Sequence, residues 1–161
     1  MLTERGDLVK GHYPIFCHQV NCRGVMGAGI AKQIREKYPE VYDTYRIHCM
    51  TANHLLGTVL PVFTHDNRIC INMFAQDGYG RAGVWTDYDA FKNCLYRLEN
   101  FLKACANKQN FRRTYGSRIY FPYNIGCGHA GGDWRKILDL LYDFQFRKVD
   151  PFEIIIVKLD R

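Results

Sequence analysis

The chain of 161 residues contains only 5 prolines and no low-complexity tract. It has no apolar run that approaches the roughly 20 residues needed to span a bilayer. The first residues, MLTERGD, lack the apolar stretch of a secretory signal. We therefore expect a cytoplasmic protein with no membrane partner.

The seven cysteines are scattered and odd in number. They form no CxxC pair, and none lies at the spacing from a histidine that a zinc site requires. Reduced thiols in a reducing compartment explain this pattern most simply. We expect no metal ion and no cofactor.

Basic residues exceed acidic ones, with 22 Lys and Arg against 16 Asp and Glu, which gives a net charge of +6. A positive field favours anionic ligands such as nucleotides, nucleic acid or phosphorylated protein. On charge alone, a soluble basic domain without such a ligand is the better explanation. We interpret the short cluster of Lys108, Arg112 and Arg113 as a solvated loop and not as a nucleic-acid site.

Apolar and β-branched runs alternate with helical patterns along the chain. The runs predict strands over Ile15–Val20, Thr58–Phe63, Arg68–Phe74, Arg118–Phe121 and Phe152–Val157. Apolar residues three or four apart predict helices over Ile30–Lys37, Glu40–Cys49, Asp87–Ala106 and Asp133–Phe146. Strands separated by helices predict a single α/β domain over residues 1–161, with helices on both faces of a sheet.

Two glycine-rich loops each join a predicted strand to a predicted helix. The first is Asn21–Lys32, NCRGVMGAGIAK, and the second is Asn124–Trp134, NIGCGHAGGDW. Glycine allows positive φ angles and a close approach of the backbone to a ligand. Free N–H groups at a helix N-terminus bind phosphate, and ligands of open α/β sheets lie beyond the carboxyl ends of the strands. One such loop can be a simple tight turn, but two in matching contexts predict a clamp for a pyrophosphate.

Neither loop has the Gly-Lys-Ser/Thr ending of a Walker A motif, and no GxGxxG pattern opens either helix. The two loops and Gly6-Asp7-Leu8 instead resemble the signature of the macrodomain family, over essentially the whole chain. This resemblance implies a three-layer α-β-α fold with a central mixed sheet. The chain is most similar to the branch that holds terminal ADP-ribose protein glycohydrolases, DNA ADP-ribosyl glycohydrolase antitoxins and ADP-ribose 1''-phosphate phosphatases.

The resemblance implies a binding site for ADP-ribose. Asp7 would accept a hydrogen bond from the adenine amino group, Leu8 would lie beside the ring, and Asn21 would face the distal ribose. The alternatives are that Asp7 is a turn residue and that Asn21 caps the loop. The remaining implied contacts are Val25, Met26, Gly27, Ala28, Gly29 and Ile30 around the distal ribose and a phosphate, and Ile125, Gly126, Cys127, Gly128, His129, Ala130 and Gly131 around the pyrophosphate.

The chain departs from the glycohydrolases of this branch at their catalytic positions. They use a lysine at the end of the strand that corresponds to Arg68–Phe74, whereas this chain has Ala75 and Gln76 there. Neither side chain can form a Schiff base, so a covalent lysine mechanism is not expected. The aspartate of their second loop is replaced by Ala130, and Asp133, three residues on, suits a helix N-cap.

His18 lies at the end of the strand that enters the first loop, where the phosphatase branch also carries a histidine. A histidine near the distal ribose can transfer a proton near neutral pH, which makes His18 and Asn21 the candidate catalytic residues. Packing of His18 in the core is the alternative. Clamping the ligand can also hold a water near the anomeric carbon without a dedicated side chain.

Three functional hypotheses follow. The leading one is hydrolysis of a substituent from the terminal ribose of ADP-ribose, carried on a protein, a nucleic acid or a 1''-phosphate. A reader that binds ADP-ribose without turnover is the alternative, and the missing lysine favours it. A nucleic-acid-binding module is the third, and it would show strong salt dependence.

Aromatic side chains add candidates for stacking on the adenine or covering the distal ribose, and these are Phe74, Tyr79, Trp85 and Tyr142. The segment from Gln76 to Arg81 contains two glycines and is interpreted as a mobile loop beside the site.

Overall fold

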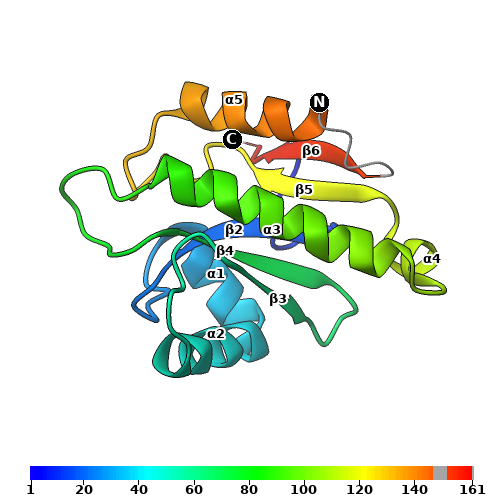
Figure 1. Cartoon of the computed structure of the whole chain (residues 1–161), viewed down its shortest axis with the longest axis horizontal. Helices are drawn as coiled ribbons and strands as arrows, with labels where there is room; N and C mark the ends of the chain where they lie inside the picture. Colours follow the sequence, from blue (N-terminus) through cyan, green and yellow to red (C-terminus); the bar gives the residue numbers. More distant parts are fainter. Residues whose placement is uncertain (147–151, 161) are drawn as a thin grey trace.

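The computed structural model describes residues 1–146 and 152–160. It contains one six-stranded sheet with helices on both faces (Figure 1). The strands are β1 (Leu2–Arg5), β2 (Ile15–Asn21), β3 (Val59–Phe63), β4 (Ile69–Gln76), β5 (Arg118–Pro122) and β6 (Glu153–Lys158). The helices are α1 (Gly29–Lys37), α2 (Pro39–Thr51), α3 (Tyr88–Ala106), α4 (Phe111–Tyr115) and α5 (Trp134–Phe146).

The sheet has the order β1-β6-β5-β2-β4-β3. Neighbouring strands from β1 to β4 pair in parallel, and β3 alone pairs antiparallel, with β4. The carboxyl ends of the five parallel strands therefore meet at one edge of the sheet. The mixed sheet and the α-β-α layers confirm the expected fold class.

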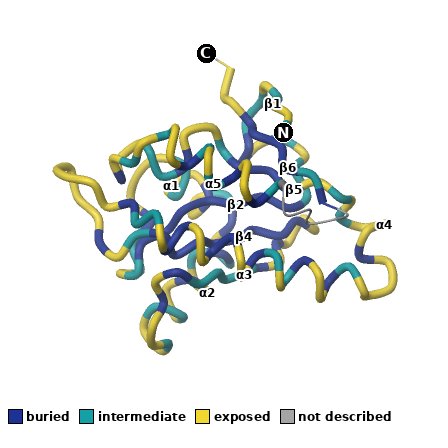
Figure 2. The backbone as a smooth tube through the Cα atoms, turned by 45° about the horizontal axis from the view of Figure 1, so that its top comes forward, coloured by how far each residue is buried: buried dark blue, intermediate teal, exposed yellow. Residues whose placement is uncertain are grey.

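Alternate residues of the central strands face two separate apolar cores. In β2, Ile15 and Cys17 pack toward α3 and α5, while Phe16 and Val20 pack toward α1 and α2. Every residue of β2 is buried, as Figure 2 shows for the middle of the molecule. Such strands, buried on both faces, are typical of parallel sheets between helical layers.

The helix boundaries follow the local signals in the sequence. α1 ends at Lys37 because Pro39 begins α2, and proline suits the first position of a helix. Asp87 caps α3 by accepting a hydrogen bond from the Ala90 N–H. Asp133 caps α5 in the same way, since its Oδ1 accepts from the Arg135 N–H at 2.9 Å, which confirms the N-cap interpretation.

Two elements were not predicted from the sequence. β1 is a short edge strand, largely exposed. α4 replaces the solvated loop that we expected around Arg112 and Arg113: Phe111 is buried and anchors one short turn of helix, while both arginines remain exposed. Among the described residues, no helix combines the length and apolar content that a membrane crossing requires.

Candidate functional site

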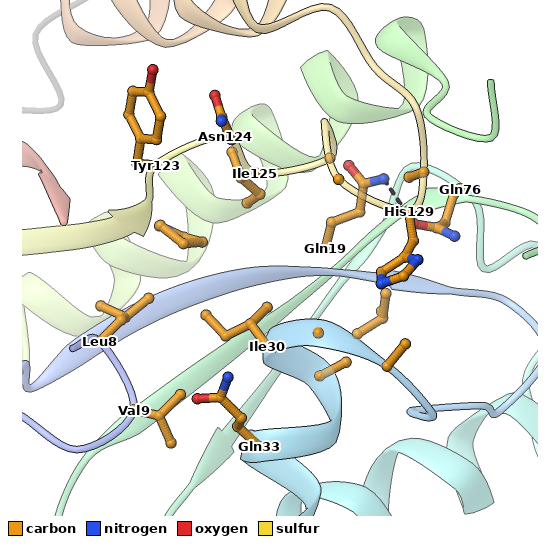
Figure 3. A pocket seen from close by; sticks show the side chains of 18 of the residues that line it. Leu8, Val9, Gln19, Ile30, Gln33, Gln76, Tyr123, Asn124, Ile125 and His129 are labelled. Carbon is orange, nitrogen blue, oxygen red and sulfur yellow. Dashed lines mark hydrogen bonds between the residues drawn. The ribbon is translucent and has the colours of Figure 1, made fainter. Parts of the chain in front are cut away.

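A pocket of about 1000 Å³ opens at the carboxyl edge of the parallel strands (Figure 3). Both glycine-rich loops contribute to it, together with the loop after β1 and the ends of β2, β4, β5 and β6. Its lining consists of segments 6–9, 19–21, 27–31, 79–81, 122–126, 128–130 and 157–159, with Val25, Gln33 and Gln76. The charged side chains of this lining are Asp7, Arg81 and Lys158, so cations outnumber the carboxylate.

The first loop presents unpaired N–H groups at the start of α1. Its N-cap residue, Ala28, has no side chain that can cap the helix, and the first turn contains no acidic residue. Within the described residues, the N–H groups from Gly27 to Ala31 have no protein acceptor. Together with the positive end of the helix dipole, they form a site suited to an anion.

The second loop is held in a tight turn that leaves further N–H groups free. Cys127 N–H donates to the Asn124 carbonyl at 2.9 Å, and Gly131 N–H donates to the Gly128 carbonyl at 3.0 Å. In the described part of the chain, the N–H groups of Gly126 and of 128–130 have no protein acceptor. The φ of +73° at Gly126 is one that L side chains rarely adopt, so the turn requires glycine.

The two loops face one another across the pocket. The His129 side chain of the second loop is exposed, and Figure 3 shows it pointing toward the first loop. A β-carbon on Gly29 would lie 3.8 Å from its Cδ2 atom. The two sets of free N–H groups therefore border a single space.

The Asn21 side chain caps the first loop. Its Nδ2 donates to the Val25 carbonyl at 2.7 Å, and its Oδ1 accepts from the N–H of Arg23 at 2.9 Å and from the hydroxyl of Tyr45 at 2.9 Å. Asn21 also lines the pocket and is 6% exposed. The structure thus shows the loop-capping alternative, with the side chain already engaged by its own loop.

His18 lies in the core and does not line the pocket. Its Nε2 is 2.6 Å from Asn72 Oδ1, and Asn72 in turn donates to the Leu60 carbonyl. Burial lowers the pKa of His18 to about 4, against a smaller opposing effect of the Asn72 hydrogen bond. The imidazole is therefore neutral near pH 7 and has no direct access to a ligand in the pocket.

Asp7 is a turn residue at the wall of the pocket. Its Oδ1 accepts from the N–H groups of Val9 and Lys10, each at 3.0 Å, as a turn residue does. The residue also lines the pocket, as does the neighbouring Leu8.

Most of the other residues implied by the resemblance line the pocket, and three do not. Met26 is buried among the apolar side chains beneath α1, and Cys127 and Gly131 are also absent from the lining. Of the aromatic candidates, Tyr79 lines the pocket, while Phe74, Trp85 and Tyr142 do not. Tyr123, which sequence reasoning missed, lines it and lies below Lys158, whose Nζ is 4.6 Å from the ring centroid.

A hydrogen-bonded network lies at the end of β4, around Gln76. Gln19 Nε2 donates to Gln76 Oε1 and to Thr86 Oγ1, both at 2.9 Å. Thr86 Oγ1 donates to the Gly126 carbonyl at 2.6 Å, which ties β2 and β4 to the second loop. Gln19 and Thr86 were not predicted; the signal for Gln19 was a polar residue in a strand that is otherwise largely apolar.

Comparison with known proteins adds to this geometry. No family model matches the chain. It is 44% identical over 175 aligned residues to an ADP-ribose 1''-phosphate phosphatase of Debaryomyces hansenii, with 93% of this chain and 97% of that protein covered. A second such phosphatase, of Scheffersomyces stipitis, is 41% identical over 69 residues, and a DNA ADP-ribosyl glycohydrolase of Mycobacterium bovis is 37% identical over 59. Those two matches span 39% and 17% of the relatives' own lengths.

Solved structures share the fold. The macrodomain of Mycobacterium tuberculosis DarG superposes with a TM-score of 0.80 at 23% identity, covering 97% of this chain and 95% of that one. Thermosipho africanus DarTG in complex with ADP-ribose superposes with a TM-score of 0.73 at 16% identity, covering 98% and 41%. With the near full-length phosphatase relative and the α-β-α layers, these findings show that the chain belongs to the macrodomain family.

Proposed function

We propose that the pocket binds ADP-ribose and that the protein hydrolyses a substituent from the terminal ribose. One observation carries this proposal: two sets of unpaired backbone N–H groups face each other across a single pocket. The names of the relatives, an ADP-ribose 1''-phosphate phosphatase and a DNA ADP-ribosyl glycohydrolase, support it. So does the ADP-ribose complex of a structural neighbour.

We propose one orientation of ADP-ribose in the pocket. The adenine would lie near Asp7, Leu8 and Tyr123, where a carboxylate, an aliphatic side chain and an aromatic ring line the wall. The diphosphate would lie between the two loops, within reach of their N–H groups. The distal ribose would then lie toward Asn21 and Gln76, at the end of β2 and β4.

The chemistry we propose depends on positioning. The loops would hold the anomeric carbon so that a water attacks it, the bond from that carbon to the substituent oxygen breaks, and the water's proton passes to the departing oxygen. A phosphate substituent supplies an oxygen that accepts this proton without a protein base. Preorganised N–H dipoles and a fixed geometry together account for large rate effects.

Within this scheme, the residues proposed from the sequence take different parts. Asn21 shapes the first loop around the distal ribose through its three hydrogen-bonded partners. His18 supports β2 and β4 from the core. Among the described histidines, His129 lines the pocket, so we propose that its side chain lies beside the diphosphate and helps to position the distal ribose.

The second candidate function is a reader of ADP-ribose or of ADP-ribosylated protein or nucleic acid. The burial of His18 favours it, because this removes the proton donor that the phosphatase resemblance implied. We also propose a cytoplasmic location. All seven cysteines are free, as expected in a reducing compartment.

Calorimetric titration with ADP-ribose tests binding, and turnover is then measured on ADP-ribosylated protein, ADP-ribosylated DNA and ADP-ribose 1''-phosphate. We expect binding and release of ADP-ribose from at least one substrate. Binding without turnover on all three would establish the reader instead. Of the two histidine variants, H129A is expected to slow turnover, and H18A is expected to keep it in the folded protein.

A further inference from the structure

Arg68, just before β4, is a buried cation held by neutral groups. It is 6% exposed, and its Cζ lies 4.0 Å from the centroid of the Phe16 ring. In the described part of the chain it forms no direct ion pair with a carboxylate. Its nitrogens donate to the carbonyls of Leu8 (2.7 Å), Val9 (2.9 Å) and Tyr13 (2.9 Å) and to the Tyr38 hydroxyl (2.6 Å). Burial of a cation is costly unless such partners compensate for lost water.

The loop that Arg68 holds is the one that presents Asp7 to the pocket. Asp7 Oδ1 accepts from the N–H groups of Val9 and Lys10. These belong to the same two peptide groups whose carbonyls, at Leu8 and Val9, accept from Arg68. Because N–H and C=O of a trans peptide point in opposite directions, each group has its negative end on Arg68 and its positive end on Asp7.

Arg68 and Asp7 are thus joined as cation and anion through two aligned peptide dipoles. The link uses Oδ1 of Asp7, while Oδ2 lies 3.9 Å from the Nζ of the exposed Lys10 side chain. Lys37 adds a second cation on the Arg68 side of these peptide groups, since its Nζ donates to the Val9 carbonyl at 2.7 Å.

We infer that Arg68 is a positioning residue that sets the Asp7 carboxylate for a donor group on the ligand's base, and so sets base preference. This inference rests on the proposed function, in which the adenine amino group donates to Asp7. The inference adds Arg68 to the residues that act on the ligand, although Arg68 does not line the pocket and contacts the face of the loop opposite to the Asp7 carboxylate.

The test compares ADP-ribose with its hypoxanthine analogue, which has a carbonyl oxygen in place of the amino group. Wild-type protein is expected to prefer ADP-ribose by about tenfold or more, the size of one hydrogen bond to a charged acceptor. In R68M this preference should fall toward equal affinity, and R68K should restore part of it. The double variant D7N/R68M should show no greater loss of base preference than D7N alone, because the two residues act through the same peptide groups.

Two further variants separate positioning from stability. L98A removes a fully buried side chain from α3, in the core on the other face of the sheet, and should lower stability while keeping the base preference. K37M removes the half-buried second cation and should shift the preference in the same direction as R68M, by less. K37M carries the test if R68M does not fold.

Hydrogen exchange supplies a readout that needs no ligand. The Val9 and Lys10 amides should exchange faster in R68M than in L98A, relative to core amides. If wild-type protein binds neither nucleotide, the proposed function fails. The other negative result concerns Arg68 alone: wild-type protein prefers ADP-ribose, and both R68M and K37M keep that preference with unchanged amide hydrogen exchange at Val9 and Lys10. That result overturns the inference on Arg68, while the proposed function stands.

Discussion

Replacement of Gly126 by alanine is expected to weaken both the fold and ligand binding. The φ of Gly126 is +73°, and a β-carbon there would lie 2.6 Å from Gln19 Oε1 and 3.0 Å from Thr86 Oγ1. A left-handed conformation costs an L-residue about 1–2 kcal/mol, and overpacking adds about 1–3 kcal/mol. The sum, roughly 2–5 kcal/mol, corresponds to a loss of about 5–15 °C in Tm for a chain of this size.

Binding should suffer for a separate reason. The added methyl group pushes the second loop away from Gln19, and this moves the free N–H groups that border the pocket. We expect the Kd for ADP-ribose to rise by about tenfold or more, as small displacements of positioning groups do. Thermal unfolding followed by circular dichroism measures the first effect, and calorimetric titration of the folded protein measures the second.

Gly116 offers the control, because it also has a positive φ, +74°, and no atom lies within 4 Å of a β-carbon there. It ends α4, away from the pocket. G116A should lower Tm and leave the Kd for ADP-ribose at the wild-type value. The reasoning is refuted if folded G126A binds ADP-ribose as tightly as G116A does.

Three further predictions concern stability. T86V removes one of two donors to the Gly126 carbonyl, which keeps the Gly132 N–H, and should cost about 0.5–1.5 kcal/mol in urea unfolding, the net contribution of a typical hydrogen bond. Because burial lowers the pKa of His18 to about 4, the unfolded state binds more protons than the folded state between pH 6.5 and pH 4. The free energy of unfolding should therefore fall by about 2 kcal/mol from pH 7 to pH 5. Urea midpoints measure this fall, and H18N should reduce the dependence of stability on pH. D133A removes the N-cap of α5 and should cost about 1 kcal/mol in thermal unfolding, whereas D133N should keep most of the stability.

The helices and strands were predictable where the apolar repeat agreed with helix-breaking or capping residues at its ends. The apolar repeat of α3 and the proline between α1 and α2 placed these helices within one or two residues of the expected bounds. β1 was not predictable, because its residues are mostly polar and it is held by backbone pairing to β6, at the far end of the chain. α4 is too short for a repeat, and it is held by tertiary contacts of Phe111 and Tyr115 with the core.

At the site, the sequence located the two loops but not the roles of the side chains around them. In a strand buried on both faces, alternation does not reveal that His18 turns toward Asn72 and away from the pocket. Arg68 and Gln19 act through partners more than fifty positions away. Such pairings arise from tertiary contact, so a local sequence pattern does not predict them.

The prominence of main-chain donors in the pocket has an evolutionary and pharmacological consequence. A point mutation to any residue other than proline replaces a side chain and leaves the peptide N–H in place, so most single substitutions cannot delete the groups proposed to hold the diphosphate. Side chains that line the pocket can therefore change during evolution while the backbone anion site is kept. A competitive inhibitor that engages these amides would leave few escape routes, since a resistant variant would have to reshape the turn itself.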